Sequence, residues 1–161
     1  MGTIDSTNSG GKIMARKAEN SSKISNRVAS LIVADDILFS IGGKAYLQGV
    51  YLSDLSIPAK GILIPQLAVM FSATADGEDQ FESVTLEVTL PENEPVRMTM
   101  PVQKVPVPEG RRRISYFWPM MLRSIVLNPG KIGAKVIHER GEIDIVSLWI
   151  TLVPPSAIPK V

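Results

Sequence analysis

The stretch ESVTLEVTL, residues 82–90, alternates between apolar and polar side chains more cleanly than any other part of the chain. In an extended strand, such a period of two places the apolar side chains on one face and the polar ones on the other. The inward residues are then Val84, Leu86, Val88 and Leu90. A strand with one apolar and one polar face packs on a core from one side only, so the stretch predicts a sheet with one buried face.

Similar segments lie on both sides of this strand, separated by turns rich in Gly, Pro and charged residues. Extended structure is predicted for residues 28–40, 44–55, 66–74, 82–90, 96–102, 114–127, 131–139 and 142–153. No segment has the period of a convincing long helix. About eight strands without a helix predict an all-β fold. We expect an antiparallel β-sandwich of immunoglobulin-like or C2-like type, with a small β-barrel as the alternative.

Particular residues sharpen this expectation. Residues 44–55 carry apolar groups on both faces, which indicates a central strand covered on both sides. Pro119 has no amide hydrogen to donate to a neighbouring strand, so it predicts a kink that divides residues 114–127 into two extended pieces. Further inward positions are expected at Leu67, Val69, Phe71 and Ala73, and in the last strand at Val146, Leu148, Ile150 and Leu152.

The composition also predicts where the domain begins and ends. Residues 1–26 are rich in Ser, Asn, Gly and Lys. Such a segment does not bury enough apolar surface to offset the entropy lost on ordering, so it is predicted to be a flexible N-terminal tail. One β-sandwich domain is predicted for residues 27–154, a length that can bury a real core. The proline-containing residues 155–161 are predicted to form a C-terminal tail.

The totals argue against several classes of protein. The formal net charge of the 161 residues is +1, too small to indicate nucleic acid as a partner. The chain has no cysteine, which rules out disulfides, thiolate metal sites and a cysteine nucleophile. No apolar run approaches the ~20 residues of a membrane helix, and none near the start is typical of a secretory signal. We therefore expect a soluble, cytoplasmic protein without a membrane span.

No arrangement of residues typical of catalysis is evident in the sequence. The single histidine, His138, lies at the end of a predicted strand, and no Gly-x-Ser-x-Gly motif accompanies it. One histidine without cysteine does not make the zinc sites that are built from several such ligands. We predict that the chain is not an enzyme and that it holds no cofactor.

Carboxylates gather at two places in the sequence. Asp35 and Asp36 interrupt the first apolar run, where a bulge or strand break is expected because adjacent strand residues point to opposite faces. The second group, called the acidic turn below, consists of Asp76, Glu78, Asp79 and Glu82. We interpret it as a solvated hairpin tip, with a calcium site as the alternative. If the domain binds a small ligand or substrate at one end, the expected lining residues are Asp35, Asp36, Asp76, Asp79 and His138.

The only basic run consists of the three arginines at 111–113, and three aromatic residues follow at 116–118. Arginines beside aromatic side chains are typical of single-stranded nucleic acid binding. The small net charge does not support that function. We therefore assign the aromatic residues to the core. The arginines are assigned either to a sheet edge, where their charge prevents pairing with another strand, or to a protein contact.

Gly49 is an isolated glycine inside a predicted strand. Such a glycine indicates a bulge or a close neighbour. We expect a large side chain of the facing sheet, Trp149 or Trp118, to lie over it. Gly49→Val is therefore predicted to destabilise the fold.

Two stretches, ADDILFSIGGKAYLQGVYLSDLSIP at 34–58 and NPGKIGAKVIHERGEIDIVSLWITL at 128–152, carry turn motifs of a known kind. With the turn after TLEVTLPENEPV, they resemble a family of small uncharacterised bacterial β-sandwich proteins over about residues 30–153. The family often has Asn-Leu where this chain has Leu47 and Gln48. The resemblance implies a β-sandwich, and it transfers no functional residue because the family has no assigned activity.

These observations predict a non-catalytic β-sandwich that works as a protein–protein interaction or accessory module, because edge strands can pair with a partner or with another copy. A small-ligand-binding or enzymatic β-domain is one alternative, and a calcium- or lipid-binding sandwich is another. The expected partner is a protein or a second copy of the chain.

Overall fold

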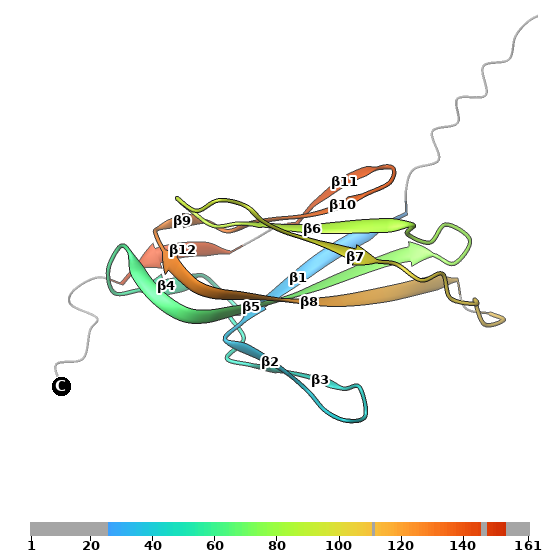
Figure 1. Cartoon of the computed structure of the whole chain (residues 1–161), viewed down its shortest axis with the longest axis horizontal. Coiled ribbons are helices and arrows are strands. Elements are labelled where there is room, and N and C mark those ends of the chain that lie inside the picture. The colour runs from blue at the N-terminus through green and yellow to red at the C-terminus, as the bar shows by residue number, and fades with distance from the viewer. Residues whose placement is uncertain (1–25, 111, 146–147, 154–161) are drawn as a thin grey trace, which may run out of the picture.

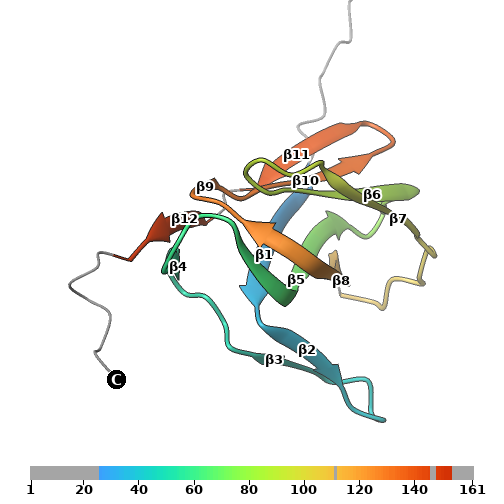
Figure 2. The ribbon, with the colours of Figure 1, turned by 60° about the vertical axis from the view of Figure 1, so that its left-hand side comes forward.

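The structure is a computed structural model, and it describes residues 26–110, 112–145 and 148–153. The predicted tails lie outside these residues, except for Asn26. All regular elements of the described residues are strands, and the two largest sheets stack as two layers with the core between them (Figures 1 and 2). The predicted all-β sandwich is therefore confirmed. No helix that could cross a membrane occurs in the described part of the chain.

The first layer is a three-stranded antiparallel sheet with the order β1-β5-β8. Its strands are β1 (Val28–Ala34), β5 (Ile62–Asp76) and β8 (Arg113–Leu127). The predicted inward residues of β5 are confirmed, since Leu67, Val69, Phe71 and Ala73 are all buried in the core. We call the opposite side of this sheet, which points away from the core, its outer face.

The second layer is a four-stranded antiparallel sheet with the order β11-β10-β6-β7. Its strands are β6 (Ser83–Thr89), β7 (Val96–Pro101), β10 (Gly133–His138) and β11 (Gly141–Ile145). The alternation of residues 82–90 is confirmed, because all four predicted inward residues are buried. Both layers are open sheets, and neither closes on itself.

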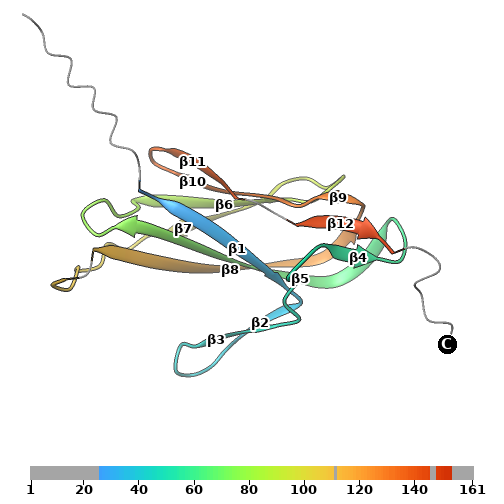
Figure 3. The ribbon, with the colours of Figure 1, turned by 180° about the vertical axis from the view of Figure 1, so that it is seen from behind.

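A third, short sheet of order β4-β12-β9 lies at the end of the molecule where the described chain stops (Figure 3). It consists of β4 (Leu55–Ile57), β9 (Gly130–Lys131) and β12 (Trp149–Leu152). β12 pairs in parallel with β4, whereas the other strand pairs of the described residues are antiparallel. In β12, Ile150 is buried as predicted and Leu152 is exposed; Val146 lies outside the described residues.

The two remaining strands, β2 (Asp36–Phe39) and β3 (Ala45–Gln48), form a hairpin of their own, called the projecting hairpin below. It leaves the first layer at the end of β1 and points away from the sandwich (Figures 1 and 3). The prediction of a covered central strand at residues 44–55 is therefore wrong. Apolar groups lie on both faces of β3 because the hairpin extends beyond the sheets.

The kink expected at Pro119 is absent, and β8 runs through this residue without a break. β8 is an edge strand, where a residue without an amide hydrogen is tolerated. The irregular residue is Ser124, whose φ is 52°. Before it, Met120 and Leu122 are buried, whereas after it Ile125 and Leu127 are buried, so the inward positions shift by one residue.

Candidate functional site

Asp35 is the residue at which the chain leaves the first layer. Its amide donates to the carbonyl oxygens of Gln48 (3.0 Å) and Gly49 (3.3 Å), which joins the two ends of the projecting hairpin. Its carboxylate accepts a hydrogen bond from the hydroxyl of Tyr51. Burial, this hydrogen bond and the charge of Asp35 raise the pKa of Tyr51 to about 12. Asp35 therefore acts as a polar joint, which agrees with the strand break expected at the aspartate pair.

Asp36 and Gln66 hold the hairpin to the sheet. The Gln66 side-chain amide donates to Asp36 Oδ1 (2.8 Å) and to the Asp35 carbonyl oxygen (3.2 Å). Asp36 Oδ1 also accepts from the amide of Ile37 (2.8 Å). Both aspartates are thus used in the architecture of the joint, far along the chain from the acidic turn.

The prediction that Trp149 or Trp118 lies over Gly49 is wrong. No tryptophan lies over this glycine; the carboxylate of Asp35 does, and a Cβ built on Gly49 would overlap Asp35 Oδ2. Gly49 also has a φ of +65°, a conformation that favours glycine. The close approach of Asp35 and the backbone conformation both require glycine here.

The base of the projecting hairpin packs on the outer face of the first layer. Ile37 of β2 is buried against a small second core made by Ala34, Ala68 and Met70, and Leu47 packs on the same group. This contact covers only the part of the outer face next to the joint. The hairpin is therefore anchored at its base, and its tip extends past the sheet.

Beyond its base, the projecting hairpin carries large apolar side chains that remain exposed. They are Leu38, Phe39, Ile41 and Tyr46. Phe39 is 59% exposed and lies two residues after Ile37, on the same side of β2, so it points toward the side of the sheet. Four such residues on one hairpin form an unusual concentration of exposed apolar surface.

The outer face of the first layer continues this apolar surface. Between the row formed by Asp76 and Arg113 and the row formed by Gln66 and Arg123, no outward position of β1, β5 or β8 carries a charged residue. The exposed outward residues there are Val28, Ser30, Ile32, Ser115 and Phe117. Phe117 is 65% exposed, so assigning all the aromatic residues 116–118 to the core is wrong for this one. We call this surface, together with the exposed apolar side chains of the projecting hairpin, the uncharged surface.

The outward face of the second layer is built quite differently. A row across all four strands places Arg97, Glu87, Lys135 and Asp144 side by side, with alternating sign of charge. Glu87 Oε2 binds Arg97 Nε (2.6 Å), and Lys135 Nζ binds Asp144 (3.5 Å). Glu87 points outward as the alternation predicts, but Arg97 and its other neighbours leave it only 8% exposed. This face is typical of a sheet that meets water.

Within the described residues, three of the four carboxylates of the acidic turn, all but Glu78, pair with cationic side chains of the same end of the sandwich. The pairs are Asp76 with Arg113 (3.6 Å), Asp79 with Arg140 (2.6 Å) and Arg27 (3.3 Å), and Glu82 with Lys104 (3.1 Å). In the described part of the chain, no group of three or more acidic, histidine or cysteine side chains is placed to hold a metal ion.

Arg27, at the start of β1, is the central residue of this end, and its side chain is 1% exposed. Its guanidinium binds Glu139 (Nη1 to Oε1, 2.7 Å) and donates to Nδ1 of His138 (2.9 Å). It also pairs with Asp79 and lies 4.6 Å from the ring centroid of Phe81. Arg27 therefore ties β1 to the acidic turn and to the end of β10.

The protonation of His138 and Glu139 follows from these contacts. Arg27 and the amide of Arg140 (3.2 Å) both donate to His138 Nδ1, which places the proton of the neutral ring on Nε2. Burial and the charge of Arg27 lower the pKa of His138. Burial alone would raise the pKa of Glu139, but hydrogen bonds from Arg27 and from backbone amides outweigh it and bring the pKa to about 2.

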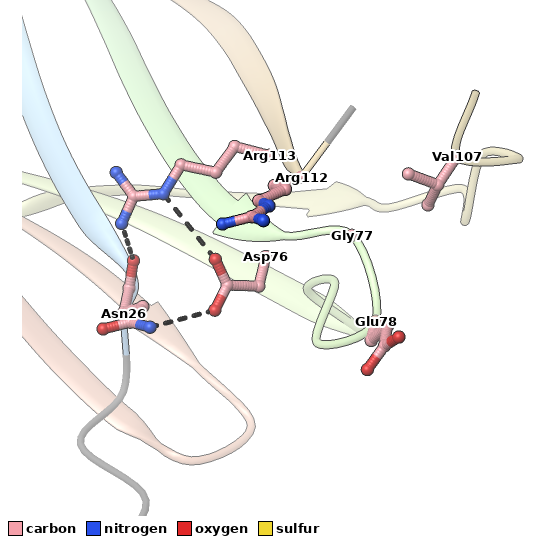
Figure 4. Close-up of a pocket in the computed structure, with 7 residues that line it drawn as sticks. All are labelled: Asn26, Asp76, Gly77, Glu78, Val107, Arg112 and Arg113. Carbon is pink, nitrogen blue, oxygen red and sulfur yellow. Dashed lines mark hydrogen bonds and ion pairs between the residues drawn. The ribbon is translucent and has the colours of Figure 1, made fainter. Parts of the chain in front are cut away.

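A hollow of about 690 Å³ lies beside the acidic turn (Figure 4). The Asp76 carboxylate accepts from Asn26 (3.0 Å) and pairs with Arg113, which also donates to the Asn26 carbonyl oxygen (3.2 Å). Glu78 stands apart from this triangle (Figure 4). The charged groups at the centre of the hollow are thus paired with one another.

The five residues expected to line one pocket are not all brought together, so that prediction is wrong. Asp79 and His138 both contact Arg27, and Asp79 also lines a small hollow of about 90 Å³, while Asp76 lines the large hollow. Asp35 and Asp36 form the hairpin joint instead. A pattern of carboxylates along the chain does not show which cationic side chain each will meet.

Sequence reasoning does not single out Arg27 or the uncharged surface. A lone arginine before a strand has no local pattern that indicates burial, because its partners lie about 50 and 110 residues further along the chain. The uncharged surface does have a signal. The outward positions of β1, and those of β5 between Gln66 and Asp76, contain no charge, unlike those of residues 82–90; examples are Ser30, Ile32, Ser72 and Thr74.

Comparison of the chain with models of protein families gives no match, and comparison with curated proteins gives none either. The resemblance to a bacterial β-sandwich family stays a prediction.

Proposed function

We propose that this chain is a non-catalytic β-sandwich module that works by binding another protein chain through its uncharged surface. The observation that carries the proposal is the difference between the two outward faces. One is crossed by a row of alternating charges, and the other has exposed Phe117 and Ile32 with no charged residue on three strands between its two end rows. Depletion of charge with enrichment of aromatic residues is typical of the centre of a protein interface.

The charged end of the sandwich supports this choice over the alternatives. A ligand or calcium ion at the acidic turn would have to compete with Arg113, Arg140 and Lys104 for the carboxylates. The uncharged surface has no such internal partners, because its apolar side chains face solvent in the single chain. A cytoplasmic location, expected from the sequence, belongs to this proposal.

Photo-crosslinking from single positions tests the proposal. A benzoylphenylalanine is placed at Phe117, at Phe39, or at the control position Thr99, which is exposed on the outward face of the second layer. The full chain is then irradiated in its own cells. We expect covalent adducts with one and the same protein chain from positions 117 and 39, and none from position 99.

The absence of adducts from both positions 117 and 39 would overturn the proposal. Equal adducts from position 99 would also overturn it, because they would show random collisions rather than a contact specific to the uncharged surface.

A further inference from the structure

We propose that the partner is a second copy of this chain, and that the projecting hairpin of each copy covers the outer face of the first layer of the other. This inference rests on the protein-contact function proposed above, because it names the occupant of the same uncharged surface. It adds to that function a two-fold symmetric dimer, a contact between the hairpin of one copy and the sheet of the other, and a mass of two chains.

The composition of the outer face suits a contact between two identical chains. In a contact with two-fold symmetry the same patch lies on both sides, so charges near the axis meet like charges. The outward positions from the row of Val28 to the row of Ala34 contain none, which lets the surface meet itself without repulsion. A different partner is usually steered and selected by complementary charge, and the outer face between these rows offers no charge for such a partner to recognise.

The shape of this side of the chain also suits a second copy. One chain carries both a protruding element, the hairpin, and a broad receiving element, the outer face, on the same side of the sandwich (Figures 1 and 3). Phe39 lies on the side of β2 that faces the sheet, and Phe117 lies on the outer face of β8. A two-fold axis between two copies would place each hairpin over the other copy's sheet. The dimer would then contain two identical contacts between a hairpin and an outer face.

The exposed apolar area is large enough for a contact between two copies. Phe39 and Ile41 of the hairpin and Val28, Ile32 and Phe117 of the outer face are the large apolar residues concerned. They expose on the order of 600 Å² per chain, taking about 150–200 Å² for one fully exposed large side chain. Two such surfaces give about 1,200 Å², which reaches the lower limit of a stable specific interface before any polar neighbours are added. An isolated two-stranded hairpin is also only marginally stable in water, so contact with a second copy would stabilise it.

The experiment is the mass of the full chain in solution, measured by light scattering between about 1 and 100 µM, the range in which a micromolar dimer dissociates. We expect twice the 17.5 kDa of one chain at the higher concentrations. Phe39→Lys and Phe117→Lys should each raise the dimer dissociation constant by at least about 100-fold, because each places a charge in an apolar contact. Thr99→Lys, on the other outward face, should leave it unchanged.

Phe39 and Phe117 are exposed in the single chain, so both variants should keep the melting temperature of an isolated chain. A wild-type chain that stays at 17.5 kDa throughout would overturn the second-copy inference. In that case, adducts to a different protein from positions 39 and 117 would keep the proposed function, and the lack of any adduct would end both. A dimer that survives both lysine variants would overturn the placement of the contact.

Discussion

Single residues decide where the chain leaves the first layer. Asp35 joins the two ends of the projecting hairpin through its amide, and its carboxylate occupies the space that a side chain at position 49 would need. The sequence could show that Gly49 has a close neighbour. It could not show which one, because alternation along a strand does not indicate that the strand has left the sheet.

Gly49→Ala should lower the free energy of unfolding more than Gly43→Ala. Both glycines have positive φ, +65° and +72°, so both variants carry a backbone strain of about 1–2 kcal/mol. Only at position 49 does the new Cβ also meet Asp35, and crowding of this kind costs about 1–3 kcal/mol more. Denaturant unfolding measures both. Equal losses in the two variants would show that Asp35 does not lie over Gly49.

The pKa values at the Arg27 cluster predict how stability depends on pH. His138 has a lowered pKa in the folded chain, so the unfolded chain binds more protons once the pH falls below the ordinary value of 6.5. The free energy of unfolding should therefore decrease as the pH is lowered from about 6.5 toward the pKa of His138 in the folded chain. Glu139 should cause a second decrease from pH 4.5 to about 2, where its carboxylate becomes protonated in the folded state.

A single substitution separates the two windows. The asparagine side chain does not titrate, and its carbonyl oxygen can still accept a hydrogen bond from Arg27. His138→Asn should therefore remove the first decrease and leave the second, because the chain has no other histidine. Unfolding measured between about pH 7.5 and 5 tests this. A wild-type chain whose stability is flat over this range would show that burial and the charge of Arg27 do not keep His138 neutral in the folded chain.

Among the strands, alternation predicts best where a strand is regular and covered on one side. It places the inward residues of β6 and of the second half of β5 correctly. It fails at Pro119, which an edge strand tolerates, and at Ser124, where a positive φ shifts the inward positions by one. It also fails for β3, because apolar groups on both faces indicate a buried strand or a projecting one equally well.

Ile37→Ser should release the base of the projecting hairpin without unfolding the sandwich. Ile37 is buried against Ala68 and Met70, whereas its neighbour Leu38 is exposed on the other side of β2. Hydrogen exchange should therefore become faster at residues 36–48 in Ile37→Ser, with β5 and β8 still protected, and Leu38→Ser is the matched control. Equal exchange in both variants would contradict the packing of the hairpin on the sheet.

In the molecule as a whole, the two outward faces differ more than their similar strands suggest. The alternating charges of Arg97, Glu87 and Lys135 suit contact with water, whereas the uncharged surface does not. Sequence alone could predict the sandwich and its core. It could not predict the uncharged surface, because that surface is assembled from β1, β5, β8 and a hairpin that only the fold brings to one side.

Intermolecular cross-linking between positions 39 and 117 tests the proposed contact most directly. The chain has no cysteine, so Phe39→Cys and Phe117→Cys each introduce a single thiol. A mixture of the two variants is treated with a bismaleimide about 10 Å long. This length matches the distance of about 10 Å between sheets that are packed face to face. We expect a two-chain product that contains one of each variant, formed faster than the products between identical variants. A mixture of Phe39→Cys with Thr99→Cys should give none. If the 39–117 product forms no faster than this control, the hairpin of one copy does not cover the sheet of another.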